Sequence, residues 1–187
     1  MNKKIDIVFN DCKAILENVP LKRFKNSRVM ILGANAFLTS YIQSVIFYAN
    51  QNNKLNCCID SFSKSSPSDL IKYFIKKDKR IKFFKKDLTK IGNLKKIFKK
   101  RYDFIFLAAT YGFPEKWLKD QIGTIFLNTY LLQQIFERYK KTNTRFLYFS
   151  SVDVYGDTNL HRKNKPVQEN YPGSLNLNSK RITYGES

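Results

Sequence analysis

The sequence predicts an α/β fold, a Rossmann-type doubly wound parallel sheet covered by helices. Short apolar runs, helix-period segments between them and a glycine turn after the first run all favour this fold. Continuous apolar runs are typical of strands buried on both faces, because helices cover each side of a parallel sheet. Strand and helix alternate along the chain, an order that favours parallel strands joined by helical crossovers.

Five apolar runs are the expected strands, at residues 29–32, 55–59, 81–84, 104–107 and 146–149. Gly33 follows the first run and Asp60 follows the second, so each is expected at the carboxyl end of its strand. Parallel strands end at the same edge of a sheet, and ligands bind at that edge in folds of this type.

Helices are expected before and between the strands. Residues 1–27 are expected to form a leader whose amphipathic helix ends at Pro20 and packs on the outside of the domain. Capping residues or apolar residues at helical spacing predict further helices near residues 37–46, 66–75, 94–98 and 125–136. Residues 28–187 are expected to form one domain of this Rossmann type.

Composition favours a folded, globular chain. Of the 187 residues, 43% are hydrophobic and 15% are aromatic, which argues against a disordered segment. No apolar run is long enough to span a membrane, and acidic residues interrupt the basic amino terminus, so no signal peptide is predicted. We therefore expect a cytoplasmic protein without a membrane partner.

The three cysteines, Cys12, Cys57 and Cys58, are expected to be reduced core residues.

The formal net charge of +19 raises a different class of function, a basic protein associated with nucleic acid. The cations concentrate between Lys76 and Arg101, but most are lysines with apolar residues between them at core spacing. Non-specific attraction to polyanions at low salt is expected from the charge alone. The sequence predicts neither specific nucleic-acid binding nor a metal site.

A phosphate-binding turn is predicted where the first strand meets the next helix, in Gly33-Ala34-Asn35-Ala36-Phe37-Leu38-Thr39. Free backbone N–H groups and the helix dipole face an anion at such a turn, which suits a pyrophosphate. Asp60 is expected where a carboxylate accepts hydrogen bonds from the adenosine ribose. Such a carboxylate would repel a 2′-phosphate and favours NAD over NADP, although Lys64 lies close by. A simple strand-ending turn and a solvated loop acid are the alternatives.

More motifs follow in order along the chain. They are Asp87-Leu88, Leu107-Ala108-Ala109, Pro114, Gly123-Thr124-Ile125, Asn128-Thr129, the segment from Phe149 to Gly156, Glu169 to Gly173, and Arg181 to Ser187. This ordered set resembles the extended short-chain dehydrogenase/reductases, the NAD-dependent epimerases and dehydratases of nucleotide sugars. The resemblance covers residues 28–187, and the branch with UDP-glucuronate decarboxylases looks closest.

The resemblance implies a reaction. In such enzymes NAD takes a hydride from a sugar carbon, and the keto intermediate is then epimerised, dehydrated or decarboxylated. Tyr184 matches the catalytic tyrosine, and Ser151 matches the residue that hydrogen-bonds the same sugar hydroxyl. Asp153 occupies the position of a glutamate that assists the second step. An ordinary surface tyrosine and a turn-capping aspartate are the alternatives.

The resemblance also implies which residues contact ligands. The cofactor would be lined by Gly33, Ala34, Ala36, Phe37, Leu38, Asp60, Asp87, Leu88, Leu107, Ala108 and Ala109. Pro114 and Arg181 would contact the substrate, a nucleotide-diphosphate sugar.

The sequence departs from the family pattern in two places. Ala36 and Thr39 replace the second and third glycines of the phosphate loop, and both are expected to widen the turn. The lysine of the family motif would be the residue immediately after Ser187, so the catalytic set is expected to be incomplete. The last parallel strand and the sugar-binding lobe are expected to be absent too, which would leave a sheet edge open to self-association.

Two interpretations follow from the resemblance. In the first, the chain is an epimerase, dehydratase or decarboxylase module of surface-polysaccharide sugar metabolism, inactive alone, whose remaining part is lost, split off or supplied by another chain. The partner expected is then a completing chain or a second copy in a homo-oligomer. In the second, it is a non-catalytic remnant that binds NAD weakly or not at all.

Overall fold

The computed structural model describes residues 3–156, 166–174, 176, 178–179 and 182–187. The chain forms two compact units. The first contains residues 1–109 and 137–148, and the second contains residues 110–136 and 149–187. The predicted leader helix therefore belongs to the same unit as the five strands of the sheet. Among the described residues, no helix has the length and apolar character needed to cross a membrane.

The first unit contains a sheet of five parallel strands in the order β3-β2-β1-β4-β5. The strands are β1 (Arg28–Leu32), β2 (Cys58–Ser63), β3 (Ile81–Lys85), β4 (Phe104–Leu107) and β5 (Arg145–Tyr148). This order is that of a Rossmann fold, in which the direction of winding reverses between β1 and β4. The predicted doubly wound parallel sheet is confirmed.

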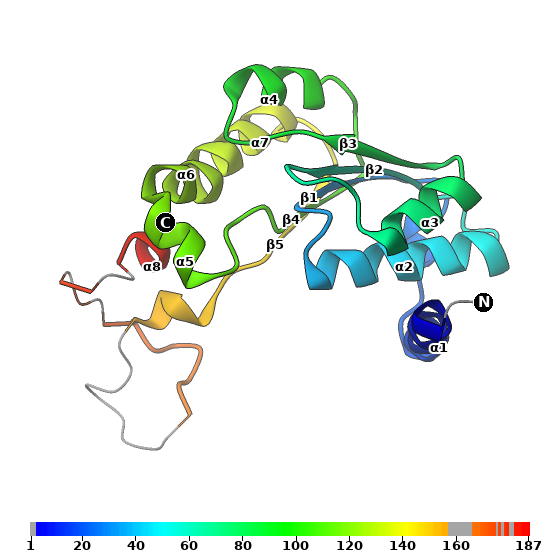
Figure 1. The fold of residues 1–187 in the computed structure, drawn as a ribbon, viewed down its shortest axis with the longest axis horizontal. Helices are drawn as coiled ribbons and strands as arrows, with labels where there is room; N and C mark the ends of the chain where they lie inside the picture. The colour runs from blue at the N-terminus through cyan, green and yellow to red at the C-terminus, as the bar shows by residue number, and fades with distance from the viewer. Residues whose placement is uncertain (1–2, 157–165, 175, 177, 180–181) are drawn as a thin grey trace. The chain divides into compact units, whose positions relative to one another are not determined.

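Helices cover both faces of this sheet (Figure 1). On one face lie α2 (Phe37–Asn52) and α3 (Asp69–Lys77), and on the other lie α4 (Ile91–Ile97) and the end of α7 (Leu131–Tyr139). Central strand β1 is enclosed between them, so four of its five side chains are buried. The helix predicted after residue 66 begins at Asp69, where the Ser68 hydroxyl accepts a hydrogen bond from the backbone N–H of Ile71.

The leader helix α1 (Lys3–Asn18) packs on the outside of α2, as its amphipathic pattern predicts. Its Phe9 ring stacks on Phe47 with ring centres 5.9 Å apart, and Asp11 accepts a hydrogen bond from the hydroxyl of Tyr41. A 3₁₀ turn, η1 (Lys22–Phe24), then leads into β1.

The second strand begins later than the sequence predicts, at Cys58 instead of Leu55. Both backbone groups of Cys57 are bound by the side chain of Asn50. Oδ1 of Asn50 accepts from the Cys57 N–H at 2.8 Å, and Nδ2 donates to the Cys57 carbonyl at 2.9 Å. Cys57 therefore pairs with a helix side chain and not with a neighbouring strand.

The backbone before this point is turned and not extended. Lys54 and Asn56 both have positive φ angles, 50° and 54°, in the left-handed region where asparagine is tolerated. Strand β2 also ends later than the sequence predicts, at Ser63. Asp60, expected at the strand end, lies in the middle of β2.

The second unit is mainly helical in its described part. It contains α5 (Pro114–Lys119), α6 (Gln121–Ile125), the π-helical turn η2 (Phe126–Tyr130), the start of α7, the 3₁₀ turn η3 (Val152–Tyr155) and α8 (Ile182–Glu186). The long helical stretch predicted from Ile125 to Phe136 is confirmed, with the π-helical turn inside it.

Candidate dinucleotide and catalytic sites

Gly33 stands where β1 turns toward α2. Its φ angle is +89°, and a Cβ there would lie only 2.4 Å from the carbonyl oxygen of Ala108. The absence of a side chain lets the end of β1 approach the residues that follow β4, Ala108 and Ala109. The structure thus brings these three predicted cofactor residues to one edge of the sheet, at the reversal of strand order.

The N-terminus of α2 carries the donors that an anion needs. Ala36 caps this helix without any side-chain hydrogen bond. The first intrahelical bond runs from the Ser40 N–H to the Ala36 carbonyl at 2.9 Å, so the N–H groups of residues 37–39 have no acceptor within the helix. The N–H groups of Gly33 and Ala34 both donate to the carbonyl of Phe62 at 3.0 Å and hold the loop against β2. The donors available to a pyrophosphate therefore belong to the first turn of a 16-residue helix, where the helix dipole also favours negative charge.

Thr39, at the position of the third family glycine, is accommodated by hydrogen bonds. It is fully buried, and its hydroxyl donates to the carbonyl of Gly33 at 2.7 Å and lies 3.1 Å from that of Ala36. The turn stays tight, since the Ala36 N–H donates to the Gly33 carbonyl at 3.1 Å. The widening expected from Ala36 and Thr39 is therefore not observed.

The other predicted cofactor residues divide into exposed and buried groups. Phe37 and Leu38 are 73% and 54% exposed and place apolar surface beside the N–H donors of α2. Ala34, Leu88 and Leu107 are at most 5% exposed, so their side chains belong to the core of the first unit. A ligand could meet these three only through their backbone atoms.

Asp60 is a buried structural carboxylate. It is 3% exposed, and its Oδ2 accepts hydrogen bonds from Lys100 Nζ at 2.7 Å and from the Tyr102 hydroxyl at 2.8 Å. The Arg28 guanidinium lies 3.8 Å from the same oxygen. Burial and the Asp60 charge both raise the pKa of Tyr102, which keeps its hydroxyl protonated as a donor. The expected position at the ribose edge is thus wrong, because β2 continues to Ser63, three residues past Asp60.

The loop after β2 and the end of β3 meet next to the phosphate loop. Asn35 Nδ2 donates to Ser65 Oγ at 2.7 Å and to the Ser66 carbonyl at 2.8 Å, so this amide ties the two loops together. Asp87 pairs with Lys64 at 3.1 Å. Burial opposes ionisation of Asp87, but hydrogen bonds from Thr89 and the Lys64 ammonium outweigh it and lower the pKa of this carboxyl.

Two predicted catalytic residues, Ser151 and Asp153, lie together at the 3₁₀ turn η3 in the second unit. The Ser151 hydroxyl donates to Asp153 Oδ2 at 2.9 Å and accepts from the Asp153 N–H at 3.2 Å, which caps the turn. The capping residue is therefore the serine and not the aspartate.

Tyr184 lies on α8, which packs against the same 3₁₀ turn. Its ring stacks on Trp117 with centroids 5.5 Å apart and an interplanar angle of 17°. Trp117 is 3% exposed, so the stack fixes Tyr184 on a buried surface. Pro114 is the first residue of α5, the helix that carries Trp117. Arg181 lies outside the described residues.

The sequence model of one family, described as the NAD dependent epimerase/dehydratase family, matches residues 29–186. The chain belongs to this family. A search of curated protein sequences found no match.

Solved structures, two of the three below being named as epimerases, share the fold of this family member. The UDP-Glc/GlcNAc 4-epimerase of Campylobacter jejuni matches with a TM-score of 0.61 at 20% identity, over 86% of this chain and 45% of that one. PbgP3 of Burkholderia pseudomallei matches with a TM-score of 0.65 at 18% identity, over 86% and 45%. The UDP-glucuronic acid 4-epimerase of Bacillus cereus, solved with NAD, matches with a TM-score of 0.60 at 19% identity, over 85% and 48%. The chain thus spans less than half the length of these structures.

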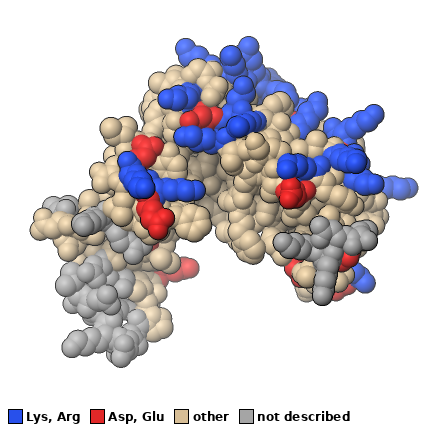
Figure 2. Space-filling model, viewed as in Figure 1, with Lys and Arg blue, Asp and Glu red and all other residues tan. Residues whose placement is uncertain are grey.

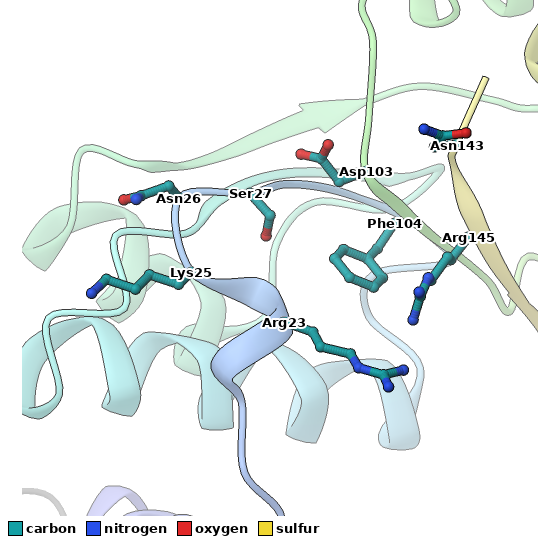
Figure 3. A pocket seen from close by; sticks show the side chains of 8 residues that line it. All are labelled: Arg23, Lys25, Asn26, Ser27, Asp103, Phe104, Asn143 and Arg145. Carbon is teal, nitrogen blue, oxygen red and sulfur yellow. The ribbon is translucent and has the colours of Figure 1, made fainter.

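A shallow hollow of about 380 Å³ lies elsewhere in this family member, at the amino ends of β1, β4 and β5 (Figure 3). Arg23, Ser27, Phe104 and Arg145 are among the residues that line it (Figure 3). The phosphate loop and the residues after β4 that are predicted to line the dinucleotide lie at the opposite, carboxyl ends of the strands. This hollow is therefore not the predicted cofactor site.

The cationic surface of this family member has partly structural roles. Figure 2 shows lysine and arginine side chains spread over the part of the first unit that contains α4 and β3. Within the predicted cationic stretch, Arg80 forms two hydrogen bonds with the buried Asp78, at 2.8 and 2.9 Å, and Lys100 binds Asp60. Sequence reasoning found the charge but not these pairings, because each joins a surface cation to an acid that only the fold buries.

Sequence reasoning also missed Asn35 as the residue that ties the phosphate loop to the next strand. The available signal was the cluster of small polar residues at 63–68, which offers several hydroxyl and carbonyl partners to one amide. That cluster was interpreted only as a helix start.

Proposed function

We propose that this chain is the dinucleotide-binding part of an NAD-dependent epimerase, dehydratase or decarboxylase of nucleotide sugars. The uncapped N-terminus of α2, located after β1 where the strand order reverses, carries the proposal. Its N–H groups and helix dipole suit an anionic pyrophosphate. Family membership supports NAD as the dinucleotide, and the names of the structural neighbours support a nucleotide-diphosphate sugar as substrate.

The proposed roles of the catalytic residues follow from their chemistry. NAD, when bound, supplies a hydride acceptor. Tyr184 takes the proton of the sugar hydroxyl as general base, and Ser151 hydrogen-bonds that hydroxyl. Asp153 holds the Ser151 hydroxyl at 2.9 Å and is proposed to assist the second step. Pro114 and Arg181 are proposed contacts of the sugar nucleotide.

The isolated 187-residue chain is proposed not to turn over a sugar nucleotide. The reason is that these 187 residues span only 45–48% of the length of the three solved structures described above. A role of the complete enzyme in surface-polysaccharide sugar metabolism fits the resemblance. Product formation from any nucleotide sugar above the no-enzyme blank would overturn the proposed inactivity.

The proposed binding function is tested by the thermal unfolding midpoint with and without millimolar NAD. A ligand that binds only the folded chain stabilises it by about 2.7 kcal/mol at one hundred times its dissociation constant, a visible shift. Ala36→Asp is the matched variant. Ala36 is exposed at the helix N-cap, where aspartate stabilises helices but would repel a pyrophosphate.

The expected result is a midpoint that rises with NAD in the natural chain. Ala36→Asp should unfold at an equal or higher temperature without ligand and show no rise with NAD. An equal rise in both proteins would place the ligand elsewhere. No rise in a natural chain that melts cooperatively would favour the remnant interpretation.

A further inference from the structure

The carboxylate that should distinguish NAD from NADP is absent from the ribose edge of this chain. In the register of the sheet, Asp60 lies beside Met30, whereas Phe62 lies beside Leu32, the residue before Gly33. The end of β2 next to the phosphate loop is therefore Ser63. A carboxylate at that edge accepts hydrogen bonds from the ribose hydroxyls and excludes a 2′-phosphate.

The charge of Asp60 is also neutralised where it lies. Lys100 donates to its Oδ2 at 2.7 Å, and the Arg28 guanidinium lies 3.8 Å away. With 3% of its surface exposed, Asp60 offers a ligand neither a hydrogen-bond acceptor nor an uncompensated negative charge.

Neutral donors and lysines occupy the vacated edge. Ser63 Oγ and Ser65 Oγ lie 3.3 Å apart, and Asn35 Nδ2 lies 3.4 Å from the first and 2.7 Å from the second. Lys64 stands between the two serines in the sequence with 66% of its side chain exposed. These groups can donate hydrogen bonds to a phosphate and bring no negative charge.

The neighbouring strand adds to the positive charge. Lys85 lies beside Ser63 in the sheet register, and the Lys86 N–H donates to the Ser63 carbonyl at 2.8 Å. Three lysines thus surround this strand end, and Asp87 is the acid paired with one of them. A phosphate monoester carries between one and a half and two negative charges near neutral pH, which suits this excess of cations.

We propose that the dinucleotide site accepts the 2′-phosphate of NADP in addition to NAD, through Ser63, Lys64 and Ser65. This inference rests on the proposed function, since it concerns the ribose end of the same site. It is carried by the sheet register and the side-chain contacts at the end of β2.

The test compares NAD⁺ and NADP⁺ binding to the full chain by calorimetry at low and at moderate salt. At low salt the dissociation constant for NADP⁺ should equal that for NAD⁺ within about threefold or be smaller. It should also rise more steeply with salt, because exposed phosphate–lysine attractions are screened. NAD⁺ binding with NADP⁺ at least about tenfold weaker at low salt would overturn the inference, a difference of about 1.4 kcal/mol.

Three variants test which side chains determine the affinity for NADP⁺ relative to NAD⁺. Ser63→Asp places a carboxylate at the strand end and should weaken NADP⁺ at least about tenfold while NAD⁺ binding is retained. Lys64→Ala should weaken NADP⁺ severalfold and leave NAD⁺ unchanged. Lys72→Ala is the matched control, because Lys72 pairs with Asp69 on the exposed side of α3. Equal behaviour of the Lys64 and Lys72 variants would contradict the assignment.

The variant Asp60→Asn tests whether Asp60 stabilises the fold or contacts the ribose. We expect a lower unfolding midpoint with an unchanged ratio of NAD⁺ to NADP⁺ affinity. A selective gain in NADP⁺ affinity would show that Asp60 faces the ribose and would overturn the inference. If this variant does not fold, the Ser63→Asp comparison decides the question alone. Binding of neither dinucleotide to the natural chain would overturn the proposed function and this inference with it.

Discussion

At Gly33 the backbone of β1 approaches the backbone after β4 so closely that a side chain has no room. The positive φ angle of +89° adds a second constraint, since left-handed backbone is unfavourable for residues with a Cβ. The phosphate loop therefore depends on this one residue, whereas the two other family glycines are replaced by Ala36 and Thr39 without opening the turn. Gly33 is therefore needed for the close approach of β1 to the residues after β4, and the fold needs a glycine there whether or not a ligand is bound.

Gly33→Ala is therefore expected to lower the free energy of unfolding by at least about 2 kcal/mol. The control is Gly92→Ala on α4, where an added Cβ meets nothing within 4 Å. Alanine there should stabilise the helix by about 0.5–1 kcal/mol. Urea unfolding measures both. A Gly33→Ala chain as stable as the natural one would contradict the close approach of β1 and β4.

Asp78 shows how an acid in a lysine-rich segment can be structural. It is 5% exposed, binds Arg80 through both carboxylate oxygens and accepts a hydrogen bond from the Asn50 amide. Burial opposes its ionisation, but the hydrogen bonds and the charge of Arg80 outweigh this effect and lower the pKa of Asp78. A lowered pKa in the folded chain stabilises the fold at pH values above the unfolded pKa, which is about 4.

Asp78→Asn is accordingly expected to cost roughly 2–3 kcal/mol at pH 7, because it leaves Arg80 without its carboxylate partner. The cost should shrink as the pH falls from about 4 through the lowered pKa of Asp78, because the unfolded chain and then the folded chain take up a proton on this carboxyl. Urea midpoints of both chains at pH 7 and pH 3 provide the measurement. A difference that stays constant across this range would show that the ionised carboxylate is not what stabilises this turn.

At the scale of elements, strand and helix positions follow largely from sequence patterns. Apolar runs located four of the five strands within one residue, because a buried strand requires apolar side chains on both faces. The run at 55–59 predicted a strand start that is three residues too early, because Asn50 binds the Cys57 backbone and β2 begins only at Cys58. A side chain from another element decides that boundary, and no local pattern reports it. The strand also ends later than predicted, at Ser63, so Asp60 lies inside β2 in a buried ion pair instead of at the predicted ribose contact.

The stack between α5 and α8 provides a direct probe of the second unit. Trp117 is the single tryptophan of the chain, and Tyr184 covers its ring. Tyr184→Ala should expose the indole and shift its fluorescence emission to longer wavelength. Tyr184→Phe, the matched variant, keeps the aromatic ring and should keep the natural spectrum while removing the proposed catalytic hydroxyl. Identical emission from all three proteins would contradict the stacking of α8 on α5.

At the scale of the whole molecule, the family resemblance predicted more of the candidate site than the periodicity of apolar residues did. Periodicity predicts parallel strands but not their order, whereas the order β3-β2-β1-β4-β5 is what places Gly33 beside Ala108. Resemblance located the candidate catalytic residues Ser151 and Tyr184 in the sequence. It could not show that the Ser151 hydroxyl is bound by Asp153 or that a tryptophan fixes Tyr184, since both depend on side-chain packing.

The position of β5 at one end of the strand order predicts self-association. Among the described strands β5 has β4 as its one neighbour, and its apolar residues Phe146, Leu147 and Tyr148 are 38–47% exposed. An edge strand with exposed apolar side chains is a template for another strand. The net charge of +19 opposes association at low salt, but screening by salt should weaken this repulsion. We therefore expect the apparent mass from light scattering to rise with protein concentration at moderate salt.

Two substitutions test whether β5 is the surface responsible. Leu147→Lys should lower the apparent mass, because a charge on an edge strand disfavours pairing. Leu118→Lys on α5, where the leucine is 39% exposed, should leave the apparent mass unchanged. A natural chain that stays monomeric at every concentration, or an equal effect of the two substitutions, would show that β5 is not the surface responsible.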